Sequence, residues 1–234
     1  MISVDTSREI YSSLSREQQL KLALFSDFGD KAPEIYKYLM SDNDEDDKTV
    51  CQKSSSKPAQ RADGVYYIYE DDTVEMFDYE KRNEPTKTVK RIGVVMGSHS
   101  LAVNLNDLPE QKLVNKEDAG NYDGYINKYD DAVADWNGQS NTEHIKAVGT
   151  DIELNDGEWI PSVAELYLVY LNKRAINVAI ELSGGSRIKD GWYWTSTEGS
   201  AAHAWGLGLY DGSLYYWYAK VSDLGYVRAV AAFH

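Results

Sequence analysis

The stretch WYWTSTEGSAAHAWGLGLYDGSLYYWYAK, residues 192–220, decides how the chain is interpreted, because it combines many aromatic side chains with glycine. Within it, WGLGL at residues 205–209 places a large apolar residue at every second position. In a β-strand these side chains would share one face, and Gly206, Gly208 and Tyr210 would share the other. Two explanations stay open: the tyrosines fill an aromatic β-core, or they form a surface that grips a ligand.

The composition is that of a globular protein. The chain has 234 residues, of which 42% are hydrophobic and 26% are charged, so it can form one large or two small domains with a sizeable core. Its formal net charge of -14 repels phosphate backbones and anionic lipid surfaces, so we expect no nucleic-acid partner. No apolar run approaches the roughly 18 residues that span a bilayer, so we expect no membrane insertion.

A single cysteine limits redox and metal chemistry. Cys51 allows no intrachain disulfide, and the sequence has no Cys/His zinc pattern. The first residues lack the basic and apolar regions of a signal peptide, so export by the usual route is not expected. The acidic run at residues 42–47 lacks the glycine and distal glutamate of an EF-hand loop, and we assign it to a solvated linker.

The chain divides into three segments. Residues 1–40 are predicted to form a small helical segment. Residues 41–62 are first acidic and then rich in Ser, Lys and Pro, which predicts a linker. Residues 63–234 would form the main domain. Runs of β-branched and aromatic residues predict three strands in its first part, at 65–77, 91–97 and 100–107.

The middle of the main domain changes to helical periodicity. Short helices are predicted over residues 129–136 and after an N-cap near Asn141. Ser162 and Glu165 match a capping box and open a longer helix, which Asn172 is expected to interrupt. Strands, then helices, then the short strands of the tail predict an α+β class.

Three pieces of the tail together resemble a known family: EWIPSVAEL at residues 158–166, WYWTSTEGSAAHAW at 192–205 and YVRAVAAF at 226–233. Their order is similar to the C-terminal C-type-lectin-like domain common in gut bacteria and their phages. The resemblance covers roughly residues 63–234 and is most specific from Trp159 onward. It implies a C-type lectin fold, distantly akin to the formylglycine-generating enzyme.

Many members of this family are variable proteins of diversity-generating retroelements, which copy a template RNA with errors at adenines. Asn codons randomised in this way yield Tyr, Ser, Gly, Asp, His, Ala, Val or Leu, but never Trp, Met, Lys, Glu or Gln. The resemblance therefore implies a variable region at about residues 199–224. Its fixed scaffold positions would be Trp205, Leu207, Leu209, Gly212, Leu214, Trp217 and Lys220. The expected ligand-binding positions are Gly199, Ala202, His203, Gly206, Gly208, Tyr210, Asp211, Ser213, Tyr215, Tyr216, Tyr218 and Ala219.

The resemblance implies a non-catalytic, cofactor-free, ligand-binding or receptor-binding protein. Tyrosine suits such a surface because it offers contact area and a hydroxyl with few rotatable bonds. The partner would be a cell-surface protein or glycan, and residues 1–60 would attach the domain to a larger assembly or support a homo-oligomer. A phage virion or the cytoplasm is the favoured location. Trp192, Trp194 and Trp205 would pack in the core rather than form a platform for sugar rings.

Two other functions remain open. One is a fixed-sequence adhesion or structural domain whose tyrosines belong to the core. The other is an enzyme like the formylglycine-generating enzyme, which needs a reactive cysteine pair where this chain has only Cys51. Glu198 is therefore expected to be a buried hydrogen-bonding group paired with Arg228. His203 is expected to be a residue that a randomised codon happens to encode in this chain. Residues 136–138 are Trp-Asn-Gly rather than the Trp-Asn-Asp of calcium-dependent lectins, so no metal is expected.

Overall fold

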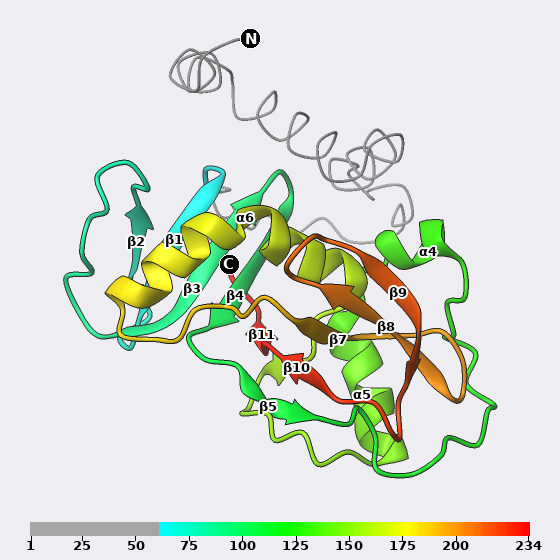
Figure 1. The fold of residues 1–234 in the computed structure, drawn as a ribbon. Coiled ribbons are helices and arrows are strands. Elements are labelled where there is room, and N and C mark those ends of the chain that lie inside the picture. Colours follow the sequence, from blue (N-terminus) through cyan, green and yellow to red (C-terminus); the bar gives the residue numbers. More distant parts are fainter. Residues whose placement is uncertain (1–60) are drawn as a thin grey trace, which may run out of the picture.

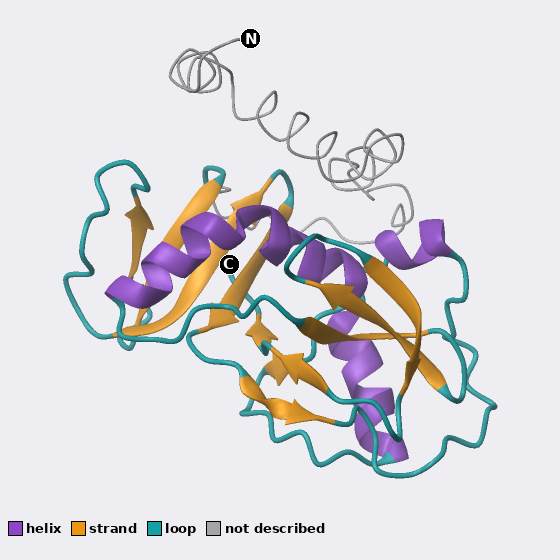
Figure 2. Cartoon of the chain, in the orientation of Figure 1, coloured by secondary structure: helices purple, strands orange, loops and turns teal. Residues whose placement is uncertain are grey.

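The structure, a computed structural model, describes residues 61–234 apart from the side chain of Trp217. The described residues confirm the α+β class, with two β-sheets and three helices (Figure 1; Figure 2). The helical segment predicted at residues 1–40 lies outside them, as does all but the end of the linker predicted at 41–62. Within residues 61–234, no helix combines the length and the apolar character needed to cross a bilayer.

The first sheet has six strands in the order β2-β1-β3-β4-β11-β6, all paired antiparallel. They are β1 (Gly64–Tyr69), β2 (Val74–Phe77), β3 (Val89–Met96), β4 (His99–Asn104), β6 (Glu158–Trp159) and β11 (Val230–Ala231). The long helix α6 (Val163–Leu182) crosses the face of β1 and β3 (Figure 1). Apolar residues of α6, β1 and β3 contribute much of the main core.

The strand predicted over residues 65–77 is in fact two strands. β1 and β2 form a hairpin, and its turn is closed by a hydrogen bond from the Tyr69 N–H to the Thr73 carbonyl at 2.9 Å. Asp72 adopts a left-handed φ of 59°, which Asp tolerates better than most residues. The β-branched and aromatic runs on both sides of this acidic turn obscured it. The strands predicted at 91–97 and 100–107 correspond to β3 and β4.

The second sheet has five strands in the order β5-β10-β7-β8-β9. They are β5 (Leu108–Gln111), β7 (Trp192–Glu198), β8 (His203–Gly208), β9 (Leu214–Ala219) and β10 (Gly225–Val227). β10 runs parallel to β7 and the other pairs are antiparallel. The chain leaves this sheet after β10 and enters the first sheet as β11, so the tail joins both sheets. β9 is an edge strand, and its outer side is not paired within residues 61–234.

The helix α6 begins where the sequence predicts. The Ser162 hydroxyl accepts a hydrogen bond from the Glu165 N–H, and the Glu165 carboxylate accepts one from the Ser162 N–H at 2.8 Å. Both halves of the capping box are therefore present. The interruption expected at Asn172 is wrong, because its side chain donates to the Leu168 carbonyl one turn earlier, at 2.9 Å, and the helix continues.

The two shorter helices start and end differently from the prediction. α4 (Tyr129–Val133) stops before the predicted end at residue 136. α5 (Gly138–Val148) has Asn137 at its N-cap, so the cap predicted near Asn141 is wrong. Asn141 lies inside α5, and its side chain donates to the buried Asp135 carboxylate at 2.8 Å. Asp135 lies between α4 and α5, so this hydrogen bond holds the first turn of α5 against the segment directly before it.

Glu165 makes the stability of the fold depend on pH. Burial raises the pKa of its carboxyl from 4.5 to about 7, although hydrogen bonds from Ser162 and Trp159 lower it. Because the folded pKa lies above the unfolded value, the native state retains a proton that the unfolded state loses between these two values. This contribution is therefore fully present below the unfolded pKa and is lost as the pH rises through the window.

Between about pH 5 and about pH 8, titration of Glu165 should lower the free energy of unfolding of the wild type by on the order of 2–3 kcal/mol. The variant Glu165→Gln should lack this decrease, because its side chain does not titrate. Urea unfolding of both proteins at both pH values gives the change in unfolding free energy with pH for each. Subtracting the change in the variant from that in the wild type removes the contribution of the other titrating groups. The same pH dependence in both proteins would contradict the assignment.

Candidate functional site

The tail forms a layer of three strands, β7, β8 and β9, whose two faces differ. On one face, Trp205, Leu207 and Leu209 are buried in the main core, as their alternation predicts. On the other face, side chains of the hairpin cover Gly206 and Gly208. This second face is called the tyrosine face, and it consists of Trp192, Gly206, Gly208, Tyr210, Tyr215 and Tyr218.

The rings of the tyrosine face gather around Trp192. Its ring centroid lies 5.8 Å from that of Tyr210, 6.0 Å from that of Tyr215 and 5.6 Å from that of Tyr218. Tyr218 also meets the ring of Trp194 edge-on at 5.0 Å. Trp194 is buried as expected, but Trp192 is only partly buried, and Tyr210 and Tyr215 are 50% and 47% exposed. An aromatic surface is therefore open to solvent.

A β-bulge places Tyr215 and Tyr218 on the same face. Tyr215 pairs with Gly206, and Tyr218 pairs with Ala204, so three steps along β9 match two steps along β8. Without this extra residue, the alternation of a strand would send the two tyrosines to opposite faces. The bulge thus lets both Tyr215 and Tyr218 contribute to the tyrosine face.

The twelve expected ligand-binding positions form three groups rather than one, and five of them lie on the tyrosine face. Five others surround the turn between β7 and β8. There Tyr216 lies on the core side, with its ring centroid 5.0 Å from that of Trp205, and its hydroxyl donates to the Gly199 carbonyl at 3.3 Å. These five positions, called the turn group, are Gly199, Ala202, His203, Tyr216 and Ala219.

Two further expected positions shape the hairpin between β8 and β9. One oxygen of the Asp211 carboxylate accepts hydrogen bonds from the Ser213 N–H at 2.9 Å and from the Ser213 hydroxyl at 2.6 Å. Gly212 between them is buried and has a left-handed φ of 77°, which matches its expected scaffold role. Asp211 and Ser213 therefore hold the turn that presents Tyr210.

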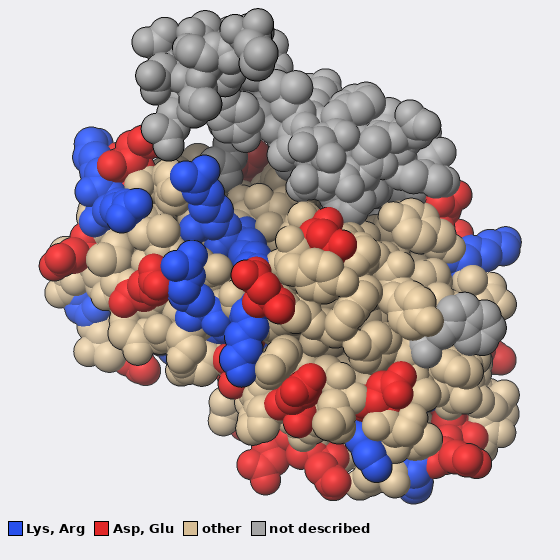
Figure 3. Space-filling view, in the orientation of Figure 1, with Lys and Arg blue, Asp and Glu red and all other residues tan. Residues whose placement is uncertain are grey.

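A groove with basic side chains borders the tyrosine face at Tyr210. Its lining includes Lys173, Arg174 and Arg187. Lys173 forms an ion pair with Asp190 at 2.6 Å. Figure 3 shows Lys and Arg side chains gathered over α6 and the segment that follows it. The tyrosine face therefore adjoins a positively charged strip on an acidic chain.

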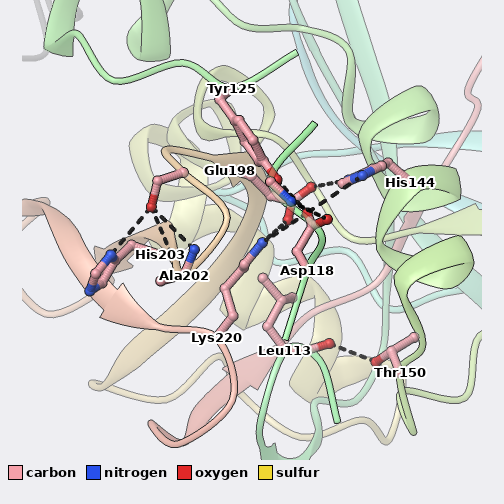
Figure 4. A network of polar contacts seen from close by, with 11 residues as sticks. Leu113, Asp118, Tyr125, His144, Thr150, Glu198, Ala202, His203 and Lys220 are labelled. Atoms are coloured by element: carbon pink, nitrogen blue, oxygen red, sulfur yellow. Dashed lines mark hydrogen bonds and ion pairs between the residues drawn. The ribbon is translucent and has the colours of Figure 1, made fainter. Parts of the chain in front are cut away.

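A buried polar network lies behind the turn group (Figure 4). Lys220 directly follows β9, is fully buried, and donates through Nζ to Glu198 Oε1 at the end of β7. The second oxygen of Glu198 contacts Nδ1 of His144 in α5. Asp118 completes the network, because its Oδ2 atom lies 3.6 Å from both Lys220 Nζ and His144 Nε2. The network thus ties the tail to α5 and to the segment before α4.

The expected pairing of Glu198 with Arg228 is wrong. Arg228 is buried where the chain passes from one sheet to the other, and it donates to the Asp107 carboxylate at 2.6 Å and to two backbone carbonyls. In the parallel pair of β10 and β7, Tyr226 lies beside Tyr193, five residues before Glu198 along β7. Arg228 is therefore directed to another part of the fold, and Lys220 is the cation that reaches Glu198.

The environment of Asp118 keeps this carboxyl ionised. Burial raises the pKa of Asp118, but hydrogen bonds from Tyr125 and Gly120 and the charges of Lys220 and His144 lower it more, so the net shift is downward. Burial, followed by the hydrogen bond to Asp118, raises the pKa of the Tyr125 hydroxyl. A negative Asp118 therefore faces the buried Lys220 ammonium.

Asp118, His144 and Glu198 form the one cluster of potential metal ligands found among residues 61–234, with ligand atoms within 4.8 Å of one another. The ammonium of Lys220 already lies against both carboxylates, so a metal ion would have to displace a buried cation. The arrangement suits a structural ion-pair network. Sequence reasoning missed Asp118 and Tyr125, because no spacing links them to the tail. The one signal was Lys220, which is the single Lys or Arg between Trp192 and Val227.

Comparisons of the chain with models of protein families, with curated proteins and with solved structures found no match. The geometry of the tail is therefore the basis for a functional assignment.

Replacing Lys220 with Met should lower the free energy of unfolding by about 3–5 kcal/mol, because Glu198 and Asp118 then stay buried without their cation. The matched control is Asp190→Asn, which breaks an ion pair whose carboxylate side chain is 80% exposed and should cost less than about 1 kcal/mol. Urea unfolding measures both values. A loss for Lys220→Met no larger than that of the control would refute the role of the network.

Proposed function

We propose that the chain is a non-catalytic ligand-binding protein of the C-type lectin fold, whose tail at about residues 199–224 is diversified by a retroelement. The observation that carries the proposal is the tyrosine face, where exposed Tyr210 and Tyr215 lie around Trp192. Aromatic side chains that combine area, rigidity and a hydroxyl are enriched in binding surfaces. A core role would require these rings to be buried, and they are half exposed.

The contacts of the glycines in the tail support diversification. A side chain at Gly206 would first meet the ring of Tyr218, at 3.3 Å, and one at Gly199 would first meet the ring of Tyr216, at 2.1 Å. At Gly208 the three nearest atoms all belong to side chains of expected variable positions, within 3.1 Å. Space at each variable glycine is thus occupied mainly by other variable side chains. A larger residue at one variable position can be accommodated when the codon of a neighbouring variable position encodes a smaller residue.

The chemistry of the tail favours binding over catalysis. Both carboxylate oxygens of Glu198 are engaged, one by Lys220 and the other by His144. The described residues contain no cysteine, since Cys51 lies outside them, so they offer no reactive cysteine pair of the formylglycine-generating type. We infer a protein or glycan of a cell surface as the ligand. In this proposal, residues 1–60 attach the domain to a larger assembly, such as a phage virion, or mediate self-association.

A fixed-sequence adhesion or structural domain is the second candidate, and one observation favours it. Asp211 and Ser213 hydrogen-bond to each other across Gly212 in the hairpin turn. Random substitution at these two codons would in most cases replace Asp211 or Ser213 and remove their hydrogen bonds. If the pair is required for the hairpin, these positions are structural and the variable set is smaller than twelve.

Sequencing the 3′ end of the gene across isolates tests the diversification. We expect substitutions at Tyr210, Tyr215, Tyr216 and Tyr218, which are exposed or only partly buried, with Trp205 and Lys220 unchanged, because both of these are buried. A tail that is identical across isolates, or substitutions that are as frequent at the buried positions, would favour the fixed adhesion domain.

Truncating the exposed rings tests the binding role. The double variant Tyr210→Ala/Tyr215→Ala should weaken binding to target cells by at least about tenfold, since a few aromatic residues dominate most interfaces. Flow cytometry with the labelled full-length chain measures this. Met76→Ala is the matched control, because Met76 is also 50% exposed but lies on β2 of the first sheet. Equal binding by the double variant and the control would count against the tyrosine face.

A further inference from the structure

A second pocket lies where the start of α5 meets β6 and the start of α6. It shares no residue with the tyrosine face, so a ligand of this pocket is independent of the function proposed for that face. The lining residues are Trp136, Asn137, Gln139, Ser140, Glu143, Trp159 and Glu165. Two features separate it from an ordinary surface depression: indole rings in its wall and a buried carboxyl group that opens into it.

The indole of Trp136 is held in a fixed orientation. One face of this ring stacks on His99, with centroids 3.6 Å apart and planes within 3° of each other. Trp136 is only partly buried and lines the pocket. Trp159 is 7% exposed, and its Nε1 atom donates to Glu165 Oε2 at 3.0 Å. Both rings are thus fixed without a ligand, which lowers the entropy cost of binding.

Glu165 brings an incompletely satisfied carboxyl into the pocket. The residue is 4% exposed, and its hydrogen bonds from the Ser162 N–H and from Trp159 both reach Oε2. Within residues 61–234, no hydrogen bond reaches Oε1, and the only hydroxyl hydrogen of Ser162 goes to the Asp135 carbonyl. A side chain at Gly138 would come within 1.9 Å of Oε2, so the glycine leaves the room that the Glu165 carboxyl group occupies. Oε1 is available to a donor in the pocket.

The charges of the pocket have one sign. Its ionisable lining residues are Glu143 and Glu165, and no Lys, Arg or His of the described part of the chain lines it. Asp135 lies close behind, with its own carboxylate saturated by Asn137, Asn141 and Thr197. Indole faces attract cations through their quadrupole, and carboxylates attract them directly. Anions and large apolar groups are both disfavoured by this lining.

We propose that this pocket binds an organic ammonium group, held by the indole of Trp136 and the carboxyl groups of Glu143 and Glu165. The group can belong to a small amine or to a cationic side chain of a larger ligand, since the chemistry of recognition is the same. Glu143 is exposed at the rim and supplies long-range attraction. Glu165 supplies negative charge at the base, and its Oε1 atom accepts a hydrogen bond from an ammonium group that carries N–H hydrogens.

Choline is a suitable probe, and 3,3-dimethylbutan-1-ol is its uncharged isostere. Choline should change the tryptophan fluorescence of the full-length chain in a saturable way, and the isostere should bind at least about tenfold more weakly, because it lacks the charge that the indole and carboxylates attract. n-Butylammonium distinguishes a preference for a primary amine. Equal affinity for choline and its isostere, or no saturable change with either ammonium probe, would overturn the proposal.

Substitutions of residues that line the pocket locate the site. Glu143→Gln and Trp136→Ala should each weaken choline binding at least about fivefold. The matched control is Glu153→Gln, which removes the same charge from an exposed residue outside the pocket and should leave binding unchanged. Equal effects of Glu143→Gln and Glu153→Gln would reduce the proposal to non-specific attraction by an acidic chain.

The pH dependence provides a readout that a purely structural role of Glu165 would not move. Burial raises the pKa of this carboxyl to about 7, so it gains its charge as the pH rises through neutrality. Choline affinity should rise several-fold over this range, and Glu165→Gln should abolish the rise. The other ionisable groups near the pocket are Asp135, Glu143 and, behind Trp136, His99. A rise that persists in Glu165→Gln would assign the titration to one of these and contradict the role of Glu165.

Discussion

The buried ion pair between Lys220 and Glu198 is the interaction on which the arrangement of the tail depends. Glu198 ends β7 and Lys220 follows β9, so the pair fixes the two outer strands of the layer relative to each other. The backbones of the same two residues hold the segment between β5 and α4. The Lys220 carbonyl accepts hydrogen bonds from the N–H groups of Leu113 and Val114, and the Glu198 carbonyl accepts one from Ile126. A buried charge pair of this kind tolerates no loss of a partner.

This constraint is consistent with the proposal that one side of the layer varies while the other stays fixed. The ion pair, Trp205 and the buried Leu207 and Leu209 define the strand positions without help from the tyrosine face. The tyrosines contact mainly Trp192, one another and the small residues beneath them. In the described part of the chain, Tyr210 and Tyr215 make no contact with a buried ring, whereas Tyr218 also packs edge-on against the buried Trp194. The ammonium pocket lies in a different setting, where the capping box of α6 fixes Glu165.

Local sequence patterns predicted the features that depend on neighbours in the chain. The alternation of large residues and glycine placed Trp205 in the core, and the spacing of Ser162 and Glu165 gave the start of α6. Contacts between distant segments could not be predicted in this way. The partner of Glu198 depends on strand order, which a single sequence does not reveal. Tyr215 and Tyr218 share a face because of a β-bulge. The alternation of side chains in the sequence does not indicate where a bulge inserts an extra residue.

The central claim is that a fixed scaffold carries a surface free to vary. A library in which the codons of the scaffold positions and of the variable positions are all randomised tests it without a ligand. The library is selected only for protease-resistant folding and is then sequenced. The account predicts broad tolerance at Tyr210, Tyr215 and Tyr218, and near-complete retention of Trp205, Glu198 and Lys220. Tyrosines retained as strictly as Trp205 would show that they belong to the core and would contradict the account.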